Sequence, residues 1–293
     1  MANYGSQSDI DPIRAVILKR PAEAYGDQAA IGAQWRALNY RAETDFATAR
    51  DQHTEFANCL GRAGAEICYL PAAAGTGLDS VYVRDTLVIA RRGAVLCRMG
   101  KPARMGEPEA MAEYLREMGV PILGAISGAG RLEGGDVTWL DERTVAVGQG
   151  YRSNAEGLRQ LRELLGAEVD EVIPVPLPHW TGPDDCLHLM SFLSPVDRDL
   201  AVVYSRLMPV PFRQQLVARG LTLVEVPDAE FDSMACNVLA LAPRQCVMLA
   251  GNPVTQAQLE AAGAQVVTYA GSDISIKGAG GPTCLTQAFW REA

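Results

Sequence analysis

The strongest constraint on the fold is a pattern that occurs five times along the chain: an amphipathic helix, a glycine, and then a short strand. The glycines come about 50 residues apart, and they are Gly64, Gly119, Gly166, Gly220 and Gly263. Glycine is favoured just past a helix end, because the left-handed conformation found there costs other residues a steric penalty. A period of this length indicates a repeated supersecondary unit.

The segments between these glycines predict the content of each unit. Ser153 with Glu156, and Thr255 with Gln258, have the spacing of a capping box at a helix start. Strand-like runs lie at 80–91, 94–98, 144–148, 201–205, 237–241 and 246–250. Each unit is therefore predicted as strand, strand, helix, strand.

The five units follow one another without a Pro- or Ser-rich linker, so we expect one α/β domain over residues 1–293. Five such units close most simply as a ring around a central axis. A generic doubly wound α/β sheet is the alternative that periodicity alone leaves open.

Composition excludes several classes of protein. There are 26 Lys and Arg against 35 Asp and Glu, a net charge of −9, which argues against binding of nucleic acid or an anionic membrane. The longest apolar runs, such as 237–243, are far shorter than the roughly 20 residues of a membrane helix. The balance of charge is compatible with a cationic small-molecule ligand.

The cysteines and the first residues indicate a cytoplasmic protein. The seven cysteines are odd in number and none has CxxC spacing, which favours reduced thiols, and with only three histidines no zinc pattern is present. Residues 1–12 are polar and lack the apolar core of a signal peptide.

Polar residues recur at one phase of the repeat, near the point where the first strand of the next unit begins. They are Asp85, Glu133, His188, Asn237 and Cys284. Equivalent positions of equivalent repeats lie on one rim of a ring, so we expect these five side chains to converge. Taken singly, each has a structural interpretation as a buried core residue, a turn residue or a strand cap. Occurring together in phase, they indicate a functional site.

The combination of a thiol, an imidazole and carboxylates favours a particular substrate chemistry. Carboxylates near a cysteine raise the pKa of its thiol and disfavour the thiolate while the site is empty. This arrangement suits a substrate that brings its own positive charge. A guanidinium is planar, cationic and able to pair bidentately with carboxylates.

Five segments resemble the guanidino-group-modifying (pentein) superfamily, and within it most closely the bacterial dimethylarginine dimethylaminohydrolases. They are 78–85 (LDSVYVRD), 132–136 (LEGGD), 150–157 (GYRSNAEG), 187–191 (LHLMS) and 280–284 (GGPTC). The resemblance covers nearly the whole chain. It implies a five-bladed α/β propeller of ββαβ modules with pseudo-fivefold symmetry, in agreement with the repeat.

The resemblance also implies catalytic roles. Cys284 would attack the guanidinium carbon, and His188 would protonate the departing amine and later activate water. Glu133 and Asp85 would hold the guanidinium nitrogens. An S-alkylthiouronium on Cys284 would then be hydrolysed to citrulline or another ureido product, with no metal or organic cofactor.

Further residues match the substrate-binding positions of the family. Asp79 falls near the amino end of the substrate, while Arg104 and Arg152 match arginines that bind its carboxylate. Asp136 belongs to the same set, and we expect it to support His188 or its loop rather than touch substrate. Residues 25–27 and their surroundings fall where the family has a mobile lid.

Departures from the family pattern leave the substrate open. Deiminases usually carry an aspartate two residues after the catalytic histidine, where this chain has Met190, which favours N-substituted guanidines. The segment 283–287 resembles deiminases, however, and Arg84 replaces an acidic or apolar residue common in the hydrolases. Arginine deiminase, an amidinotransferase and a non-catalytic binding protein are the alternatives, and a homodimer is left open.

Overall fold

The computed structural model describes residues 3–292, and in that part of the chain the strands form five three-stranded sheets. The first sheet combines the two ends of the chain, in the order β15 (Gln287–Arg291), β1 (Ile13–Leu18), β2 (Glu66–Tyr69). The other four are β3 (Leu87–Ala90), β4 (Gly93–Leu96), β5 (Ile122–Ala125); β6 (Val137–Asp141), β7 (Thr144–Gln149), β8 (Glu171–Pro176); β9 (Leu193–Asp197), β10 (Leu200–Val203), β11 (Thr222–Glu225); and β12 (Leu239–Ala242), β13 (Gln245–Leu249), β14 (Gln265–Tyr269).

Every sheet has the same topology. The middle strand pairs antiparallel with the first strand and parallel with the third. A parallel pair needs a crossover connection, and in each sheet a helix provides it: α3 (Phe46–Arg62), α4 (Glu107–Glu117), α5 (Ala155–Leu165), α6 (Val210–Ala218) and α8 (Pro253–Ala261). The repeating unit is therefore ββαβ, as predicted.

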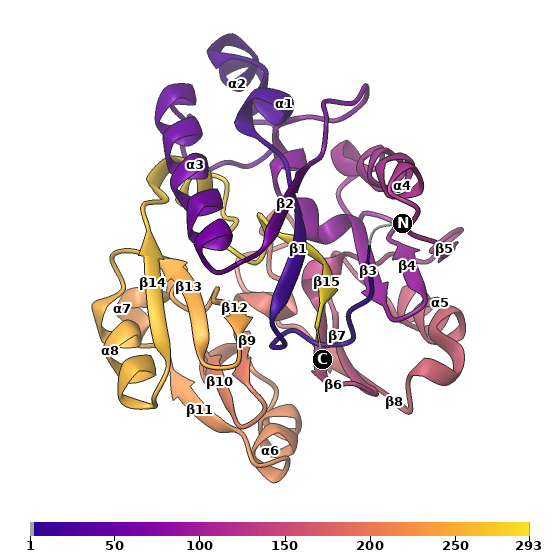
Figure 1. Cartoon of the computed structure of the whole chain (residues 1–293), viewed down its shortest axis with the longest axis vertical. Helices are drawn as coiled ribbons and strands as arrows, with labels where there is room; N and C mark the ends of the chain where they lie inside the picture. Colours follow the sequence, from indigo (N-terminus) through magenta and orange to yellow (C-terminus); the bar gives the residue numbers. More distant parts are fainter. Residues whose placement is uncertain (1–2, 293) are drawn as a thin grey trace.

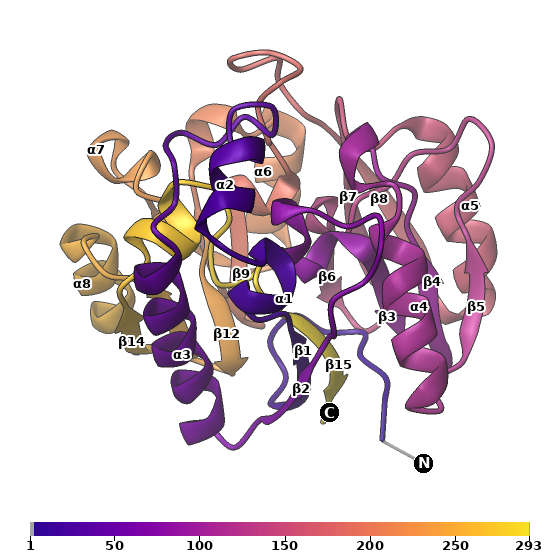
Figure 2. The ribbon, with the colours of Figure 1, turned by 90° about the horizontal axis from the view of Figure 1, so that it is seen from above.

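The sheets surround a central axis, with the crossover helices on the outside (Figure 1). Because β15 pairs with β1, with Ile13 opposite Arg291, the last strand of the chain completes the first sheet and closes the ring. The fold is the predicted five-bladed α/β propeller. Seen from above in Figure 2, α1 (Pro21–Tyr25) and α2 (Gln28–Gln34) lie beside the β1–β2 sheet, and α7 (Asp228–Phe231) lies near α8.

The remaining short elements are single helical turns, several of which precede the first strand of a blade. Turns of 3₁₀ helix span Leu78–Val81, Val83–Thr86, Pro102–Arg104, Gly134–Asp136, Gly166–Glu168, Leu189–Ser191 and Ser205–Leu207, and a π turn spans Ser272–Ile276.

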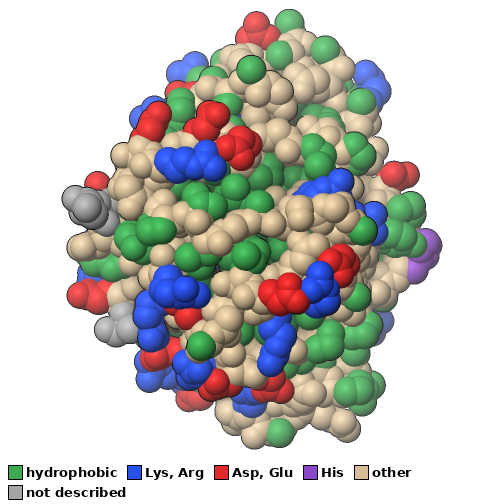
Figure 3. All heavy atoms as spheres, turned by 90° about the vertical axis from the view of Figure 1, so that its right-hand side faces the viewer, with side chains coloured by type: hydrophobic (Ala, Val, Ile, Leu, Met, Phe, Trp, Pro, Cys, Tyr) green, Lys and Arg blue, Asp and Glu red, His purple; other side chains and the backbone are tan. Residues whose placement is uncertain are grey.

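The crossover helices are held by apolar side chains that pack on the sheets. Leu161 and Leu165 of α5, and Met111 and Leu115 of α4, are fully buried. Burial of each such side chain stabilises the fold by about 1.5–3 kcal/mol. On the face formed by these two helices, Figure 3 shows hydrophobic side chains across the middle, with acidic and basic side chains interspersed around them.

The five repeat glycines all have positive φ angles, between 58° and 89°, which confirms their prediction as helix-ending residues. Two other local predictions were wrong. Helix α5 is capped by Asn154, whose side chain accepts from the Gly157 amide, because Ser153 is used elsewhere. Helix α8 starts at Pro253, and Thr255 lies inside it, bonded to Glu230.

The predicted strand at 80–91 is also shorter than expected, because β3 begins only at Leu87. The preceding residues form two 3₁₀ turns, in which the amides of Ser80 and Tyr82 donate to the carbonyls of Gly77 and Asp79. In the described residues, no helix is both long enough and apolar enough to span a bilayer.

Candidate active site

The five in-phase polar residues all lie just ahead of the first strand of a blade. Asp85 precedes β3, Glu133 precedes β6, His188 precedes β9, Asn237 precedes β12 and Cys284 precedes β15. Four of them line one cavity of about 170 Å³, and Glu133 lies directly behind it. The convergence expected from periodicity is therefore present in the structure.

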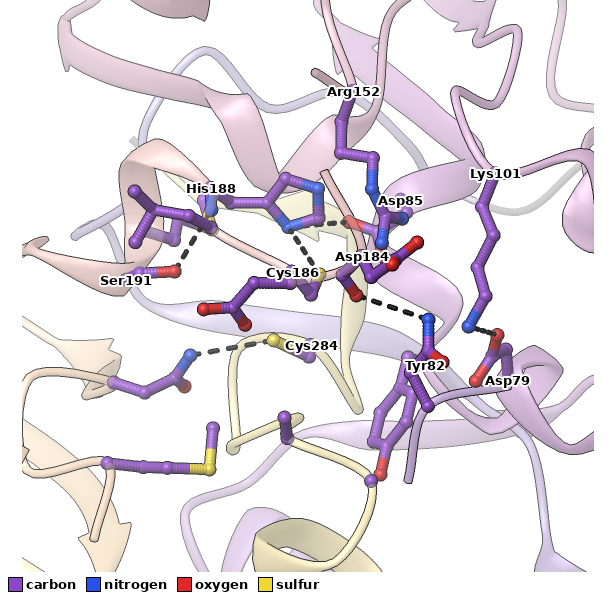
Figure 4. A pocket seen from close by; sticks show the side chains of 18 of the residues that line it. Asp79, Tyr82, Asp85, Lys101, Arg152, Asp184, Cys186, His188, Ser191 and Cys284 are labelled. Carbon is purple, nitrogen blue, oxygen red and sulfur yellow. Dashed lines mark hydrogen bonds and ion pairs between the residues drawn. The ribbon is translucent and has the colours of Figure 1, made fainter. Parts of the chain in front are cut away.

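The cavity combines charged, apolar and sulfur-containing side chains (Figure 4). Its acidic and basic side chains are Asp79, Asp85, Asp184, Asp185, Asp232, Arg41, Lys101, Arg104 and Arg152. Its apolar wall includes Leu38, Tyr82, Trp180, Met190, Phe231 and Met234, and two cysteines, Cys186 and Cys284, also line it.

The thiol of Cys284 is partly buried and touches Asn237, whose Nδ2 donates to Sγ at 3.5 Å. Burial raises the pKa of this thiol, and the nearby Asp85 and Cys186 raise it further, although His188 opposes them. The resting site therefore favours the protonated thiol. All seven cysteines are free in the structure.

The imidazole of His188 contacts Glu133 on one side and faces Cys186 and Asp85 on the other. Its Nε2 lies 2.7 Å from Oε2 of Glu133, while Nδ1 lies 3.7 Å from both Sγ of Cys186 and Oδ1 of Asp85. Burial would lower the pKa of His188, but Cys186, Asp85 and Asp136 outweigh it and raise that pKa well above its usual value. An imidazolium with Nδ1–H toward the cavity follows from this environment.

Glu133 lies behind His188 and is not among the described residues that line the cavity, and its contact with a substrate guanidinium stays a prediction. It is fully buried. Its Oε1 accepts from the amides of Gly100 and Lys101, and its Oε2 contacts His188 and Arg152. Burial would raise the pKa of Glu133, but the hydrogen bond and charge of His188 lower it overall. The carboxylate is thus an ionised partner that fixes the imidazole.

Asp85 faces the cavity and is itself held by Arg104. Its Oδ2 lies 2.6 Å from Nη1 of Arg104, and its Oδ1 accepts from the Gly135 amide at 3.0 Å. Arg104 also donates to both carboxylate oxygens of Glu107 and to the carbonyl of Tyr82. Arg104 therefore anchors Asp85 while it lines the cavity, and its binding of a substrate carboxylate stays a prediction.

Arg152 is bound less tightly than Arg104. Its guanidinium makes a 3.4 Å contact with Oε2 of Glu133, and in Figure 4 it reaches toward the cavity from above His188. It is therefore better placed than Arg104 to meet an anionic group of a ligand.

Asp136 bonds the loop that carries His188 and is absent from the cavity wall defined by the described residues. Its Oδ1 accepts from the Leu189 amide, and its Oδ2 accepts from the Ser153 hydroxyl at 2.5 Å. Burial raises the pKa of Asp136 to about 6. Ser153 also accepts from the amide of Glu133, so one hydroxyl connects the two loops.

Asp79 is paired with a residue that the sequence did not single out. Nζ of Lys101 lies 2.6 Å from Oδ2 of Asp79 and donates to the carbonyl of Leu38 at 2.7 Å. Lys101 belongs to the same loop as Arg104, which the sequence identified as a candidate site residue. The residues around Lys101 contain no pattern that would have predicted a place for it in the cavity.

The segment 38–41 contributes to the cavity wall, and the lid expected at 25–27 and its surroundings stays a prediction. Tyr25 is buried at the end of α1, whereas Leu38, Asn39 and Arg41 line the cavity. Asn39 donates to the carbonyl of Asp184, and Arg41 donates to that of Asp232. Arg84, the other departure noted above, pairs with Asp9 and the carbonyl of Val137, away from the cavity.

Asp85, Glu133 and His188 also have the composition of a metal site, with one ligand atom from each lying within 4.8 Å of the others. Both carboxylates, however, already contact guanidinium groups, from Arg104 and Arg152. The arrangement is thus electrostatically compensated by the protein's own cations.

A cysteine, a histidine and a carboxylate around one cavity of a five-bladed α/β propeller define a member of the guanidino-group-modifying (pentein) superfamily. Residues 21–291 match the family model described as N,N dimethylarginine dimethylhydrolase, eukaryotic. The chain belongs to this family.

Similar proteins include several members of the superfamily. An uncharacterized protein of Bacillus subtilis, YkgA, is 28% identical over 83% of this chain and 81% of its own length. The N(G),N(G)-dimethylarginine dimethylaminohydrolase of Pseudomonas aeruginosa is 26% identical over 84% of this chain and 90% of its own. Arginine deiminase of Mycobacterium marinum is 30% identical, over 53% of this chain and 45% of its own length.

Solved structures share the fold. A Pseudomonas aeruginosa dimethylarginine dimethylaminohydrolase, as a cysteine-to-serine mutant complexed with citrulline, has a TM-score of 0.76 at 23% identity, covering 95% of this chain and all of that one. SxtG, an amidinotransferase from Microseira wollei, has a TM-score of 0.80 at 14% identity, covering 99% and 98%.

Proposed function

We propose that this chain hydrolyses a guanidinium C–N bond of an N-substituted arginine, releasing an amine and a ureido product such as citrulline. The observation that carries the proposal is that the Cys284 thiol, the His188 imidazole and the Asp85 carboxylate line the same cavity. Membership of the dimethylarginine dimethylhydrolase family supports hydrolysis as the reaction class.

The first half of the reaction forms a covalent intermediate. Asp85 binds guanidinium N–H groups and orients the carbon toward Cys284, whose thiol releases its proton to solvent as the cation binds. The sulfur attacks that carbon and forms a tetrahedral adduct. His188, protonated and held by Glu133, donates its Nδ1 proton to the departing nitrogen, and the C–N bond breaks to leave an S-alkylthiouronium.

The second half restores the enzyme. His188 is now neutral and takes a proton from a water molecule that attacks the thiouronium carbon. The hydroxyl of the resulting adduct then loses its proton to solvent as the C=O bond of the ureido product forms. The C–S bond breaks, its electron pair returns to the sulfur of Cys284, and a proton from solvent restores the thiol. Glu133 stabilises the imidazolium at the start and at the end of the cycle.

The ligand's charge should control the reactivity of Cys284. Since burial, Asp85 and Cys186 raise the pKa of this thiol, alkylation by iodoacetamide is expected to be slow at pH 7 and to accelerate only as the pH rises through that elevated pKa. A saturating unreactive guanidinium that leaves the sulfur accessible should move the pH profile of alkylation toward lower pH. Peptide mass spectrometry of Cys284 measures the rate. A profile that the guanidinium leaves unchanged, or moves upward, would contradict the mechanism.

Met190 is the cavity residue expected to select the substituent. It is buried and lines the cavity at the position where deiminases carry an aspartate, and its thioether offers no strong acceptor for guanidinium N–H groups. Met190→Asp is expected to shift the ratio of kcat/KM for arginine over dimethylarginine upward by about tenfold or more. Met190→Leu is the matched control, and it should preserve the preference for the substituted substrate. Equal ratios in both variants would remove Met190 from the specificity argument.

The proposal as a whole is tested by incubating the protein with asymmetric dimethylarginine, arginine and agmatine, and measuring ureido product, dimethylamine and ammonia. Dimethylamine from the first substrate supports the proposal. Ammonia from arginine alone would identify a deiminase, and product formation that requires an added amine acceptor would identify an amidinotransferase. The absence of product from every substrate would overturn the assignment of the substrate.

A further inference from the structure

Asn237 is the one in-phase polar residue to which the proposed reaction gives no part. It lies in the turn between α7 and β12, is buried, and lines the cavity beside Cys284. Its backbone amide donates to the carbonyl of Met234, which closes that turn. The side chain is thus presented to the cavity from a fixed backbone.

The hydrogen bonds of Asn237 determine which way its amide points. Oδ1 accepts from the Thr283 amide at 3.0 Å and from the Thr283 hydroxyl at 2.8 Å. A flipped amide would place its NH₂ group against the Thr283 N–H, two donors facing each other. The oxygen therefore belongs on Thr283, and Nδ2 is directed at the sulfur of Cys284, 3.5 Å away.

The loop that carries Cys284 is shaped to accept this side chain. A Cβ added at Gly281 would lie 2.4 Å from Oδ1 and 2.5 Å from Cγ of Asn237, which is closer than real Cβ contacts allow. The absence of a side chain at Gly281 lets the amide lie flat against the 281–284 turn. Asn237 and the nucleophile loop thereby form one packed unit.

We propose that Asn237 is a positioning residue for the nucleophile: its amide fixes the 281–284 turn through Thr283 and donates a hydrogen bond that orients and stabilises the Cys284 thiolate. The inference rests on the proposed function in taking Cys284 as the nucleophile. Asp85 and Cys186 surround the sulfur with groups that disfavour its anion, whereas Nδ2 of Asn237 is a neutral donor that favours it.

Asn237→Asp is the sharpest test, because aspartate is nearly isosteric, retains an oxygen for Thr283, and replaces the N–H donor with a second carboxylate oxygen beside the sulfur. The pH profile of Cys284 alkylation by iodoacetamide is expected to move upward by roughly one unit or more. Asn237→Ser gives a neutral variant whose hydroxyl is too short to serve both Thr283 and Cys284, and it should show a smaller upward shift.

Asn252→Asp is the matched control, since Asn252 is equally buried but donates to the carbonyls of Ser233 and Leu249. Its alkylation profile should coincide with that of the unaltered protein. Circular dichroism identifies any variant that fails to fold, and if Asn237→Asp fails, the profile of Asn237→Ser decides. A profile unmoved in the folded variants would overturn the proposal.

The alkylation measurements need no substrate, so the positioning role of Asn237 and the proposed function can be rejected independently of each other. A shifted profile in a protein that releases no ureido product would retain Asn237 as the thiolate partner and reject the substrate assignment. Where turnover is present, Asn237→Ser is also expected to lower kcat about tenfold while KM changes less, because the cavity that binds the guanidinium is left in place.

Discussion

Replacing Cys284 with serine is expected to abolish turnover, with a loss on the order of 10⁶-fold in kcat, the scale seen when a nucleophile is removed from a catalytic unit. The serine hydroxyl has a much higher pKa than a thiol, and neither the guanidinium charge nor Asn237 brings it to the anionic form. Substrate binding should persist, because Asp85 and Arg152 are untouched. Steady-state release of ureido product measures the first effect, and calorimetric titration of substrate measures the second.

The second thiol of the cavity provides the control for this experiment. Among the described residues, Cys186 is the cysteine in contact with the imidazole, 3.7 Å from Nδ1 of His188, so the assignment of Cys284 as the nucleophile has to be tested against it. Cys186→Ser is expected to retain activity within about tenfold, the cost of one altered hydrogen-bond neighbour. If Cys186→Ser were inactive while Cys284→Ser turned over substrate, the two sulfurs would exchange roles and the proposed cycle would have to be rebuilt on Cys186.

Much of the fold could be predicted because its signal is local and repeated. A glycine that ends a helix is required by its own backbone conformation, and five of them at similar spacing reveal the number of blades. The pairing of β15 with β1 has no such signal, since it joins opposite ends of the chain. Ring closure follows from the number of blades rather than from any residue in either strand.

The convergence of the polar residues could be predicted because they recur at one phase of the repeat. The contacts that each of these side chains makes could not be predicted from the repeat. Glu133 and Arg104 both match substrate-binding positions in sequence, yet one is fully enclosed behind His188 and the other is bound by Asp85 and Glu107. These contacts depend on side-chain direction within loops of different blades. Periodicity predicts where a loop lies on the rim of the ring. It does not predict which side chains of that loop face the cavity and which are enclosed by other residues.

Local capping signals failed where tertiary contacts competed for the same side chain. Ser153 has the spacing of a helix cap, but its hydroxyl bonds Asp136 and Glu133, and the neighbouring Asn154 caps α5 instead. The cost of leaving Oδ2 of the buried Asp136 carboxylate without a donor exceeds the gain from a surface cap, which an adjacent residue can supply.

His188→Ala is expected to lower kcat for dimethylarginine by about 10²–10⁴-fold, the range for loss of a general acid and base. The imidazole acts as an acid in the first half of the cycle and as a base in the second. A substrate whose leaving group needs no proton makes the first half independent of His188, so the two roles can be tested separately. An S-alkyl isothiourea analogue of arginine releases a thiolate, which departs without a proton. With this analogue the variant should complete the first half, lack the base for the second, and accumulate the thiouronium on Cys284.

Intact-protein mass spectrometry would detect that accumulation as a stable mass increase, and peptide mapping would place it on Cys284. His179→Ala is the matched control, because that imidazole contacts Tyr151 in an exposed position and should be dispensable. A His188→Ala protein that turned over dimethylarginine at the unaltered rate would remove the imidazole from the mechanism. A variant that hydrolysed the analogue without any adduct would show instead that water attack needs no base from His188. The second half would then depend on another group facing the cavity, such as the Asp85 carboxylate.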